Sequence, residues 1–301
     1  MINFSDEAIA MPFDTLEEKS FVQLLEMAIA EDVDSIGDLT SKATLPPDLM
    51  GKATLVGRTD GILAGIETGE RVLKKLAPDA EWFSLVQDGA SIKHGTEIAK
   101  IQGPIRGILS AERIILNFIQ RLSGIASLAA KFVTKVKDLP VKILDTRKTT
   151  PGWRYLDKFA VRCGGGCNHR MNLSDGILIK DNHLAALGGG AVAIRKSILL
   201  SRQYYPGNWD IEVEVEDMQM FETALQSSPT IILLDNMCLE DMKAAVDRRN
   251  AVAPEILLEA SGGINIENVR DIALTGVDRI SIGAITHSAP ALDLALDYNF
   301  S

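Results

Sequence analysis

The chain has 301 residues, of which 46% are hydrophobic and 24% charged, and its formal net charge is −10. This composition is typical of a globular protein with a substantial core, and the acidic balance argues against nucleic acid as a general partner. No apolar run approaches the roughly 18 residues that a membrane span needs, so a membrane partner is not expected either.

The N-terminal part of the chain is predicted to form an α+β domain over residues 1–115. Its first fifteen residues are acidic and contain Pro12, a pattern unlike that of a signal or transit peptide. Because three cysteines are too few for a disulfide framework, we expect a reduced, cytoplasmic setting. Helices are expected over 16–30 and 67–76, and strands over 52–56 and 61–63. A long helical segment over 111–137, interrupted near Ser123-Gly124, follows.

The C-terminal half alternates short apolar strands with segments of helical spacing. Such alternation indicates βαβ units and a parallel sheet whose strands are buried on both faces. Because six strands fall short of the eight of a closed barrel, we predict an open or incomplete α/β barrel over residues 116–288, or a further strand that the pattern does not show. The expected strands cover 141–144, 177–179, 211–215, 231–234, 256–258 and 280–282, and the expected helices 184–204, 218–225, 239–249 and 266–274.

Polar or glycine-rich residues follow each expected strand. In α/β barrels the carboxyl ends of the strands form the active site, which makes these residues the first candidates for chemistry. They are Asp145 to Lys148, Lys180 to His183, Glu214 and Glu216, Asp235 and Asn236, Glu259 to Gly263, and Gly283.

Residues 142–180 are basic although the whole chain is acidic. Eight Lys or Arg stand against three Asp, which gives +5 over 39 residues and leaves −15 for the remainder (−10 − 5). The stretch is either a solvated basic face or an anion pocket on an otherwise acidic protein.

Two late strands lead into glycine-containing loops. Gly262 and Gly263 stand between a strand and a helix, and Gly283-Ala284 follows the next strand. Backbone N–H groups of such loops can hold a phosphate, and late strands frequently carry the phosphate site of a barrel. A tight turn from strand to helix also needs glycine, so the motif alone leaves both explanations open.

Carboxylates gather on one strand and at the end of the next. Glu212, Glu214 and Glu216 alternate along the strand and therefore share a face, and Asp235 ends the following strand. Together with substrate phosphates and water, these acids could hold Mg²⁺. They could equally cap helices or pair with lysines.

The segment Cys163-Gly-Gly-Gly-Cys167-Asn-His169 suggests zinc at first sight. However, no second pair of Cys or His stands at the usual spacing to supply the remaining ligands. We therefore expect packing or turn roles for these cysteines and no metal at this segment.

Several motifs, in order along the chain, resemble the quinolinate phosphoribosyltransferase family from about residue 16 to residue 298. The departures are Trp153, Asp157 and Phe159, where the family favours Leu, Glu and Tyr, and the first fifteen residues, which look like a variable leader. The motifs are Gly37-Asp-Leu-Thr-Ser41, Glu112-Arg113, Leu122-Ser-Gly-Ile-Ala126, Asp145-Thr-Arg-Lys-Thr-Thr-Pro-Gly152, Cys163-Gly-Gly-Gly-Cys-Asn-His-Arg170, Leu178-Ile-Lys-Asp-Asn-His183, Val213-Glu-Val-Glu216, Leu234-Asp-Asn236, Glu259-Ala-Ser-Gly-Gly263 and Gly283-Ala-Ile-Thr-His-Ser288.

The resemblance implies a fold and a reaction. An N-terminal α/β sandwich domain would precede an open α/β barrel, and the tail 289–301 would return to the first domain. The enzyme would transfer phosphoribose from phosphoribosyl pyrophosphate to quinolinate, giving nicotinate mononucleotide, CO₂ and pyrophosphate in NAD biosynthesis. It would need Mg²⁺ but no organic cofactor, and it would act as a homodimer or higher homo-oligomer with shared active sites.

The resemblance also implies roles for individual residues. The quinolinate pocket must offset two adjacent carboxylates, for which bidentate arginine is well suited. Its implied ligands are Arg147, His169, Arg170 and Lys180, with Arg113 from a neighbouring subunit. The groups implied for phosphoribosyl pyrophosphate and Mg²⁺ are Lys148, Glu214 and Asp235, which together with Lys180 would also be the catalytic groups. The implied 5′-phosphate site consists of Ser261, Gly262, Gly263, Gly283 and Ala284.

Two other functions remain open from the residues alone. Lys180 at a strand end could form a Schiff base, as in a barrel lyase. A paralogous phosphoribosyltransferase for another acid, such as nicotinate, or an anion-binding protein would share the basic segment. A flavodoxin-like phosphoribosyltransferase is disfavoured, because that class has paired acids after its key strand and Asp235 is followed by Asn236.

Overall fold

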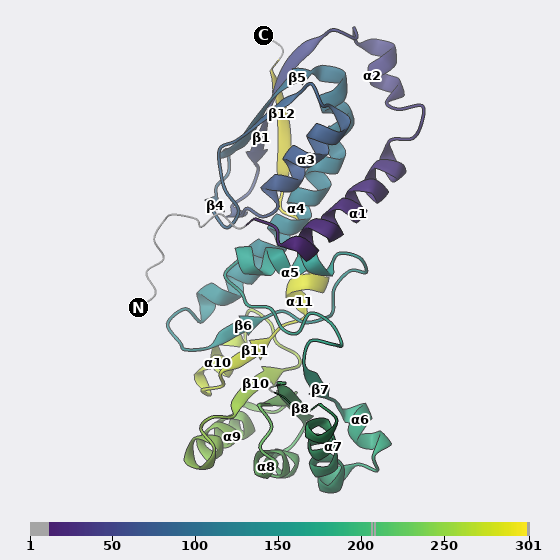
Figure 1. The fold of residues 1–301 in the computed structure, drawn as a ribbon. Helices are drawn as coiled ribbons and strands as arrows, with labels where there is room; N and C mark the ends of the chain where they lie inside the picture. The colour runs from purple at the N-terminus through teal and green to yellow at the C-terminus, as the bar shows by residue number, and fades with distance from the viewer. Residues whose placement is uncertain (1–11, 206, 208, 300–301) are drawn as a thin grey trace. The chain divides into compact units, whose positions relative to one another are not determined.

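The computed structural model describes residues 12–205, 207 and 209–299 (Figure 1). The chain divides into two compact units. Unit 1 comprises residues 12–130, 148–165 and 285–299, and unit 2 comprises residues 131–147, 166–205, 207 and 209–284. The first eleven residues of the expected leader lie outside the described part, and the boundary expected at residue 115 falls within one helix, α4 (Ile105–Lys135).

Unit 1 is an α+β sandwich built around an antiparallel sheet with the strand order β12-β1-β5-β3. β1 (Met50–Gly57) pairs with β5 (Glu97–Pro104) and with β12 (Leu294–Asn299), so residues near the end of the chain form a strand of this sheet. The other strands are β3 (Glu81–Ser84) and the small pair β2 (Gly61–Ile62) and β4 (Ser91–Ile92). The helices are α1 (Thr15–Asp32), α2 (Leu39–Thr44), α3 (Ile66–Leu76), most of α4, α5 (Arg154–Cys163) and most of α11 (Ala284–His287).

Short polar motifs determine where the first two helices begin. Asp14 and Glu17 form a capping box at the start of α1, in which each side chain accepts the main-chain N–H of the other residue. Asp38 caps α2 by accepting the main-chain N–H of Ser41 at 3.0 Å. The segment after Asp38 therefore forms a short helix.

The interruption expected near Ser123-Gly124 is absent, because α4 runs without a break from Ile105 to Lys135. The two small residues serve close packing instead. A Cβ added to Gly124 would lie 2.1 Å from the carbonyl oxygen of Pro290, and the Ser123 hydroxyl accepts the main-chain N–H of Ala64 at 3.0 Å. The local pattern could not distinguish these cases, since a helix break and a close contact both favour small residues.

Unit 2 contains six parallel strands in the order β6-β11-β10-β9-β8-β7. β7 to β11 are neighbours in the order of the sequence, and β6 pairs with β11. Within the described residues β6 and β7 are the two edge strands and do not pair with each other, so the barrel is not closed. The predicted open α/β barrel and its six expected strands are confirmed. Cys167 forms an isolated parallel bridge beside Leu144, which covers part of the β6 edge. The strands are β6 (Lys142–Leu144), β7 (Ile177–Ile179), β8 (Ile211–Val215), β9 (Ile231–Asp235), β10 (Leu257–Ser261) and β11 (Arg279–Ser281).

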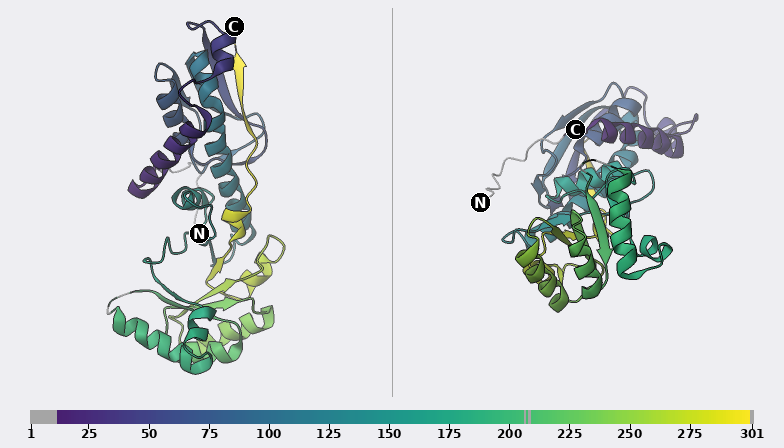
Figure 2. Two further views of the ribbon diagram at one scale, coloured as in Figure 1. Left: turned by 90° about the vertical axis from the view of Figure 1, so that its right-hand side faces the viewer. Right: turned by 60° about the horizontal axis from the view of Figure 1, so that its bottom comes forward.

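Helices α7 (Gly190–Tyr204), α8 (Met218–Gln226) and α9 (Leu239–Val252) lie in a row beside this sheet (Figures 1 and 2). The helix expected over 184–204 is divided into α6 (Asp181–Ala186) and α7, because Gly188 and Gly189 adopt positive φ angles of 95° and 73°. The remaining helix is α10 (Val269–Leu274).

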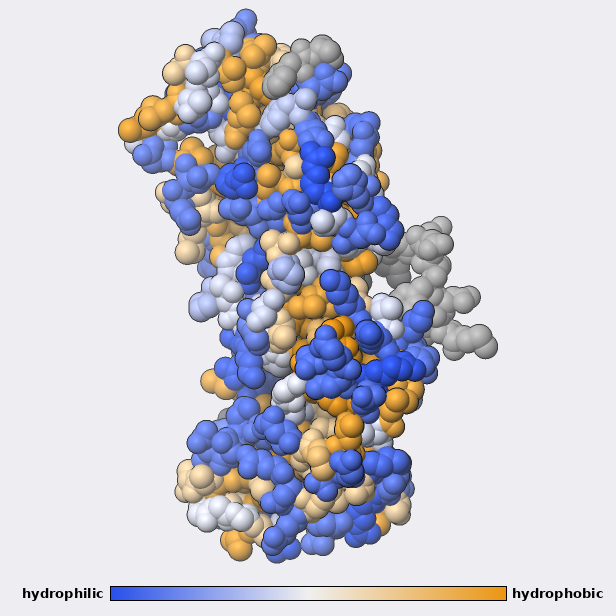
Figure 3. Space-filling view, turned by 180° about the vertical axis from the view of Figure 1, so that it is seen from behind, coloured by the Kyte–Doolittle hydropathy of each residue, from blue (hydrophilic) through white to orange (hydrophobic). Residues whose placement is uncertain are grey.

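Hydrophilic and hydrophobic residues are interspersed on the face drawn in Figure 3. Singly exposed apolar side chains of this kind are usual on protein surfaces. Within the part of the chain that the structure describes, no helix combines the length and the apolar character that crossing a membrane would require.

We predict that Gly124→Ala lowers the free energy of unfolding by about 1–3 kcal/mol, because the new methyl group would overlap the carbonyl oxygen of Pro290. Chemical denaturation of the variant and of the wild type measures the difference. Lys131→Ala, at an exposed position of the same helix, is the matched control and should change this free energy by less than about 0.5 kcal/mol. Equal effects of both substitutions would contradict the close packing of α4.

Candidate functional site

The parallel strands of unit 2 bring residues from distant parts of the sequence to one edge of the sheet. Lys180 directly follows β7, Asp235 ends β9, and Ser261 ends β10 as the register partner of Asp235. Gly283 and Ala284 follow β11 at the same edge. This carboxyl-end edge is where α/β barrels carry their active sites.

Lys180 and Glu214 form an ion pair at this edge. The Lys180 Nζ lies 3.0 Å from Oε2 of Glu214, and the two side chains are 46% and 10% exposed. Burial raises the pKa of Glu214, and the nearby charge of Asp235 adds to this effect, while Lys180 opposes it. Glu214 and Asp235 are therefore close enough to repel one another, and a cation would relieve the repulsion. Their oxygen atoms are the ligands that Mg²⁺ prefers.

The loop after β10 requires glycine. Gly262 has a φ of +93°, and a Cβ there would lie 2.2 Å from the side-chain oxygen of Asn236. Asn236 in turn donates its main-chain N–H to the carbonyl of Ser261 at 2.9 Å and its amide group to Asp235 at 2.8 Å. Gly263 borders open space, because a Cβ there would meet nothing within 4 Å. The loop is thus held against the end of β9 on one side and leaves room for a ligand on the other.

Two arginines of unit 2 lie close together without full pairing. The Nε atoms of Arg147 and Arg170 are buried and have no hydrogen-bond partner among the described residues, although Nη1 of Arg170 donates to the carbonyl of Gly176 at 3.1 Å. Burial and the charge of Arg147 both lower the pKa of Arg170. Because two neighbouring guanidinium groups repel, the arrangement favours a ligand that carries more than one negative charge.

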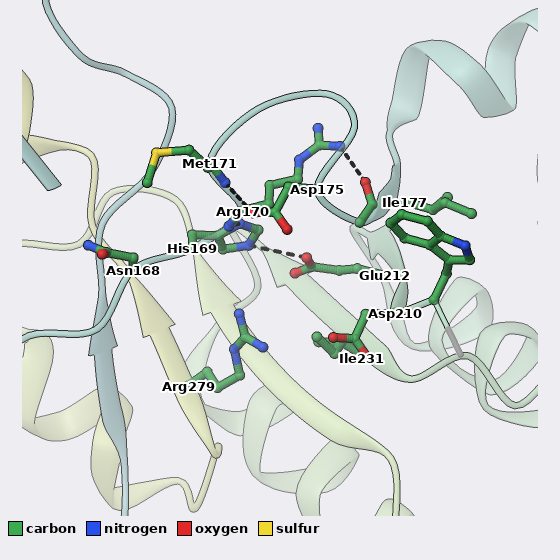
Figure 4. Close-up of a pocket in the computed structure, with 12 residues that line it drawn as sticks. Asn168, His169, Arg170, Met171, Asp175, Ile177, Asp210, Glu212, Ile231 and Arg279 are labelled. Atoms are coloured by element: carbon green, nitrogen blue, oxygen red, sulfur yellow. Dashed lines mark hydrogen bonds and ion pairs between the residues drawn. The ribbon is translucent and has the colours of Figure 1, made fainter. Parts of the chain in front are cut away.

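His169 lies on the inner side of the parallel sheet, with 9% of its side chain exposed. Its Nε2 is 3.1 Å from Oε2 of Glu212 and 3.3 Å from Oε1 of Glu259, which belong to strands separated by β9. Burial alone would lower the pKa of His169, but the two carboxylates raise it to about 9. Figure 4 shows the imidazole and Glu212 directed toward one another, with Arg279 beside them.

Arg279 completes this cluster. It is the register partner of Glu259 and places Nε 2.8 Å from Oε2 of that side chain. Burial by itself would raise the pKa of Glu259, but His169 and Arg279 hold it below its ordinary value. Among residues 12–205, 207 and 209–299, the one group of three side chains that could ligate a metal is His169, Glu212 and Glu259, and it includes none of the cysteines.

A cavity of about 440 Å³ borders the cluster (Figure 4). Arg170 and Trp209 line it together with Ile177 and Ile231, which are the first residues of β7 and β9. The cavity therefore opens toward the amino ends of the strands, away from Lys180 and the other strand-end residues. His169 and Arg170, which the resemblance implies as quinolinate ligands, border this cavity, whereas Lys180, Asp235 and the glycine-containing loops do not.

Two of the residues expected in the site, Lys148 and Arg113, belong to unit 1. Lys148 is exposed, and its carbonyl accepts the hydroxyl of Thr286 at 2.9 Å. Arg113 is an exposed residue of α4, next to Glu112, which accepts the Tyr298 hydroxyl. Both cations lie at the surface of unit 1.

Sequence reasoning missed the pairing of Glu259 and Arg279 inside the barrel. The available signal was a charged residue within a strand that is otherwise apolar, because a buried charge requires a partner. The three alternating acids, two within β8 and Glu216 directly after it, have different environments. Glu214 pairs with Lys180, whereas Glu212 faces His169 and Glu216 is exposed beyond the strand end.

Comparison with known proteins gives consistent matches over most of the chain. Residues 38–123 match the family described as quinolinate phosphoribosyl transferase, N-terminal domain, and residues 125–297 match the corresponding C-terminal domain. The chain is 40% identical to nicotinate-nucleotide pyrophosphorylase (carboxylating) of Mycobacterium leprae, over 91% of this chain and 95% of that one. It is 38% identical to quinolinate phosphoribosyltransferase (decarboxylating) 1b of Nicotiana tabacum, over 91% and 81%. The structure of nicotinate-nucleotide pyrophosphorylase from Francisella tularensis superimposes with a TM-score of 0.87 at 35% identity, covering 97% of this chain and 100% of the other.

Proposed function

Because the chain belongs to the quinolinate phosphoribosyltransferase family, we propose that it transfers phosphoribose from phosphoribosyl pyrophosphate to quinolinate with loss of CO₂. The product is nicotinate mononucleotide, a precursor of NAD. One observation supports this substrate above all: Arg147 and Arg170 lie close together with unpaired, buried Nε atoms. Quinolinate carries two adjacent carboxylates, which two guanidinium groups can bind in a bidentate manner.

The first step is a substitution at the anomeric carbon of the ribose. The pyridine nitrogen forms a bond to this carbon while the bond to pyrophosphate breaks, and the electron pair leaves with pyrophosphate. The protein contributes mainly by positioning and by electrostatic stabilisation. The proposed quinolinate ligands are Arg147, His169, Arg170 and Lys180, and the proposed 5′-phosphate ligands are Ser261, Gly262, Gly263, Gly283 and Ala284.

The leaving group carries several negative charges and needs cations. The ammonium group of Lys148 would donate hydrogen bonds to pyrophosphate and offset part of its negative charge. Glu214 and Asp235 would hold Mg²⁺, largely through water and the substrate, and the ion when bound would supply further positive charge to the departing oxygens. The Lys180–Glu214 ion pair would keep both side chains at the strand ends, between the two substrates.

The second step is decarboxylation. Bonding to ribose leaves a positive charge on the pyridine nitrogen, beside the carbon that carries the 2-carboxylate. When CO₂ departs, this charge stabilises the electron pair left on the ring carbon, and a proton then takes the place of the carboxylate. The substrate itself thus acts as the electron sink, so the proposal includes no organic cofactor.

The ion pair argues against a Schiff-base lyase. An ammonium group held 3.0 Å from a carboxylate and 46% exposed differs from the desolvated amine that such chemistry requires. Borohydride reduction in the presence of a carbonyl substrate should therefore give no covalent adduct at Lys180. We further propose a reduced, cytoplasmic setting, which is consistent with the three free cysteines.

The direct test is incubation of the purified protein with quinolinate, phosphoribosyl pyrophosphate and Mg²⁺. Nicotinate mononucleotide and CO₂ should appear together and in equal amounts, and omission of Mg²⁺ should suppress both. Nicotinate offered in place of quinolinate should react far more slowly. Comparable rates for the two acids would favour a paralogue with a different substrate.

Arg170→Ala should weaken quinolinate binding about ten- to hundredfold, because a charge-assisted bidentate contact contributes roughly 1.5–3 kcal/mol. Binding of phosphoribosyl pyrophosphate should change little. Calorimetric titration of each substrate measures both effects, with the exposed Arg195→Ala as a matched control. Equal losses for the two substrates would remove Arg170 from the quinolinate site.

Asp235→Ala should impair the use of phosphoribosyl pyrophosphate and raise the Mg²⁺ concentration needed for half-maximal activity, because one of two carboxylates near the ion is lost. The fold should persist, since Asp235 lies at the end of its strand and is not fully buried. Steady-state kinetics over a range of Mg²⁺ concentrations, with circular dichroism, measures the two properties. Asp247→Ala is the exposed control. Unfolding of the Asp235 variant without a separable kinetic effect would make this residue structural.

Arg113 is proposed to act in the quinolinate pocket of a neighbouring subunit, which would make a homodimer the smallest active form. The variants Arg113→Ala and Lys180→Ala should each be inactive alone. After subunit exchange, each mixed dimer would hold one site with both substitutions and one site with neither. Activity per mixed dimer should therefore recover toward half of the wild-type value. Exchange confirmed by native mass spectrometry without any recovery would exclude action across the interface.

A further inference from the structure

His169 is bound through both of its ring nitrogens. Nε2 faces Glu212 and Glu259 at 3.1 and 3.3 Å, while Nδ1 accepts the main-chain N–H of Arg170 at 2.8 Å. The main-chain N–H of His169 itself donates to Asp145 at 2.9 Å. The imidazole thus connects two acids of the inner sheet face to the main chain of Arg170, which is one of the proposed quinolinate ligands.

The charges of this cluster balance only if the ring is protonated. Glu259 is fully buried and the side chain of Glu212 is 6% exposed, so both carboxylates need nearby positive charge. Arg279 supplies one, which leaves the second for His169, in accord with its pKa of about 9. The Arg170 N–H contact at Nδ1 favours the uncharged ring instead. The proton on His169 therefore depends on the two carboxylates.

The influence of the cluster extends to the guanidinium of Arg170. Glu212 raises the pKa of Arg170, against the lowering effects of burial and of Arg147. Asp175 acts in the same direction as Glu212 and also accepts the main-chain N–H of Met171 at 2.7 Å. The main chain and the side chain of Arg170 are thus both tied to the acids around His169.

We propose that Glu212 and Glu259, with Arg279 as their counter-charge, are positioning residues for quinolinate binding. They hold the ring of His169, itself a proposed quinolinate ligand, protonated and in place beside Arg170. This inference rests on the proposed function, and it assigns none of the three residues to direct contact with the substrate. Glu212, Glu259 and Arg279 belong to β8, β10 and β11, whereas the segment 168–170 lies outside the regular strands. The contacts of Glu212 and Glu259 with His169 therefore fix this segment against the sheet.

Glu259→Gln is the most direct test, because it keeps the shape of the side chain and removes its charge. The pKa of His169 should fall by about one unit or more, since one of the two carboxylates that raise it is gone. NMR titration of protein labelled in its four histidines measures this, with the His169 signal identified by its loss in His169→Asn. The KM for quinolinate should rise about tenfold and should begin to rise at lower pH than in the wild type, while the KM for phosphoribosyl pyrophosphate stays within about twofold.

Glu255→Gln, at an exposed position shortly before the same strand, is the control and should change none of these values. If Glu259→Gln does not fold, Glu212→Gln provides the same comparison. An unchanged His169 pKa, or an equal rise in both KM values, would overturn the proposal. Calorimetric titration that shows Zn²⁺ binding to the wild type but not to Glu259→Gln would also overturn the proposal, because it would identify the cluster as a metal site. Should no nicotinate mononucleotide form at all, the proposed function fails, whereas the titration of His169 still tests the network.

Discussion

The six strands of unit 2 run parallel, so that all of their carboxyl ends reach the same edge of one sheet. The juxtaposition of Lys180, Glu214 and Asp235 depends on this constraint, because they lie at or next to the carboxyl ends of three neighbouring strands. Glu212 and Glu214 lie on the same face of β8, but at different positions along the strand. Glu214 lies near the edge and pairs with Lys180, whereas Glu212 lies deeper and faces His169.

Charged groups inside a barrel are costly, and this chain places several there. Glu259 and Glu212 are compensated by His169 and Arg279 instead of by solvent. Apolar side chains of similar volume would stabilise such a core at least as well, which points to a role other than stability. Support of an anion-binding segment is such a role, because the cluster ends at Arg170 and leaves the Nε atom of its guanidinium unpaired.

The chemistry of phosphoribosyl transfer suits a site of this kind. Both substrates of the proposed reaction are anions, and this reaction separates charge at the ribose while it requires little proton transfer. A site that supplies fixed positive charge at the correct positions can therefore provide much of the stabilisation. In the proposed site, Arg147, Arg170 and Lys180 from the basic stretch would supply these cations on an otherwise acidic chain. Arg147 and Arg170 are close enough for the charge of one to affect the pKa of the other.

The sequence by itself determined the parallel strands of unit 2. Each strand is buried on both faces and therefore appears as a short apolar run, and a polar cluster follows it. The motifs around Arg147, Arg170 and Lys180 likewise indicated an anion site. Only the tertiary structure decided the partners of the acids. Glu212 and His169 are 43 residues apart, and Glu259 and His169 are 90 apart, so no local pattern links them.

The same distinction explains the error at Gly124. From the local sequence, a glycine within a helical segment predicts a helix break. The structure instead requires glycine at this position because the backbone of Pro290, 166 residues further along the chain, packs against it. Local propensity acts within a few residues and is visible in the sequence. Close contacts and the pairing of buried charges depend on which segments fold against one another, and only the complete fold specifies that.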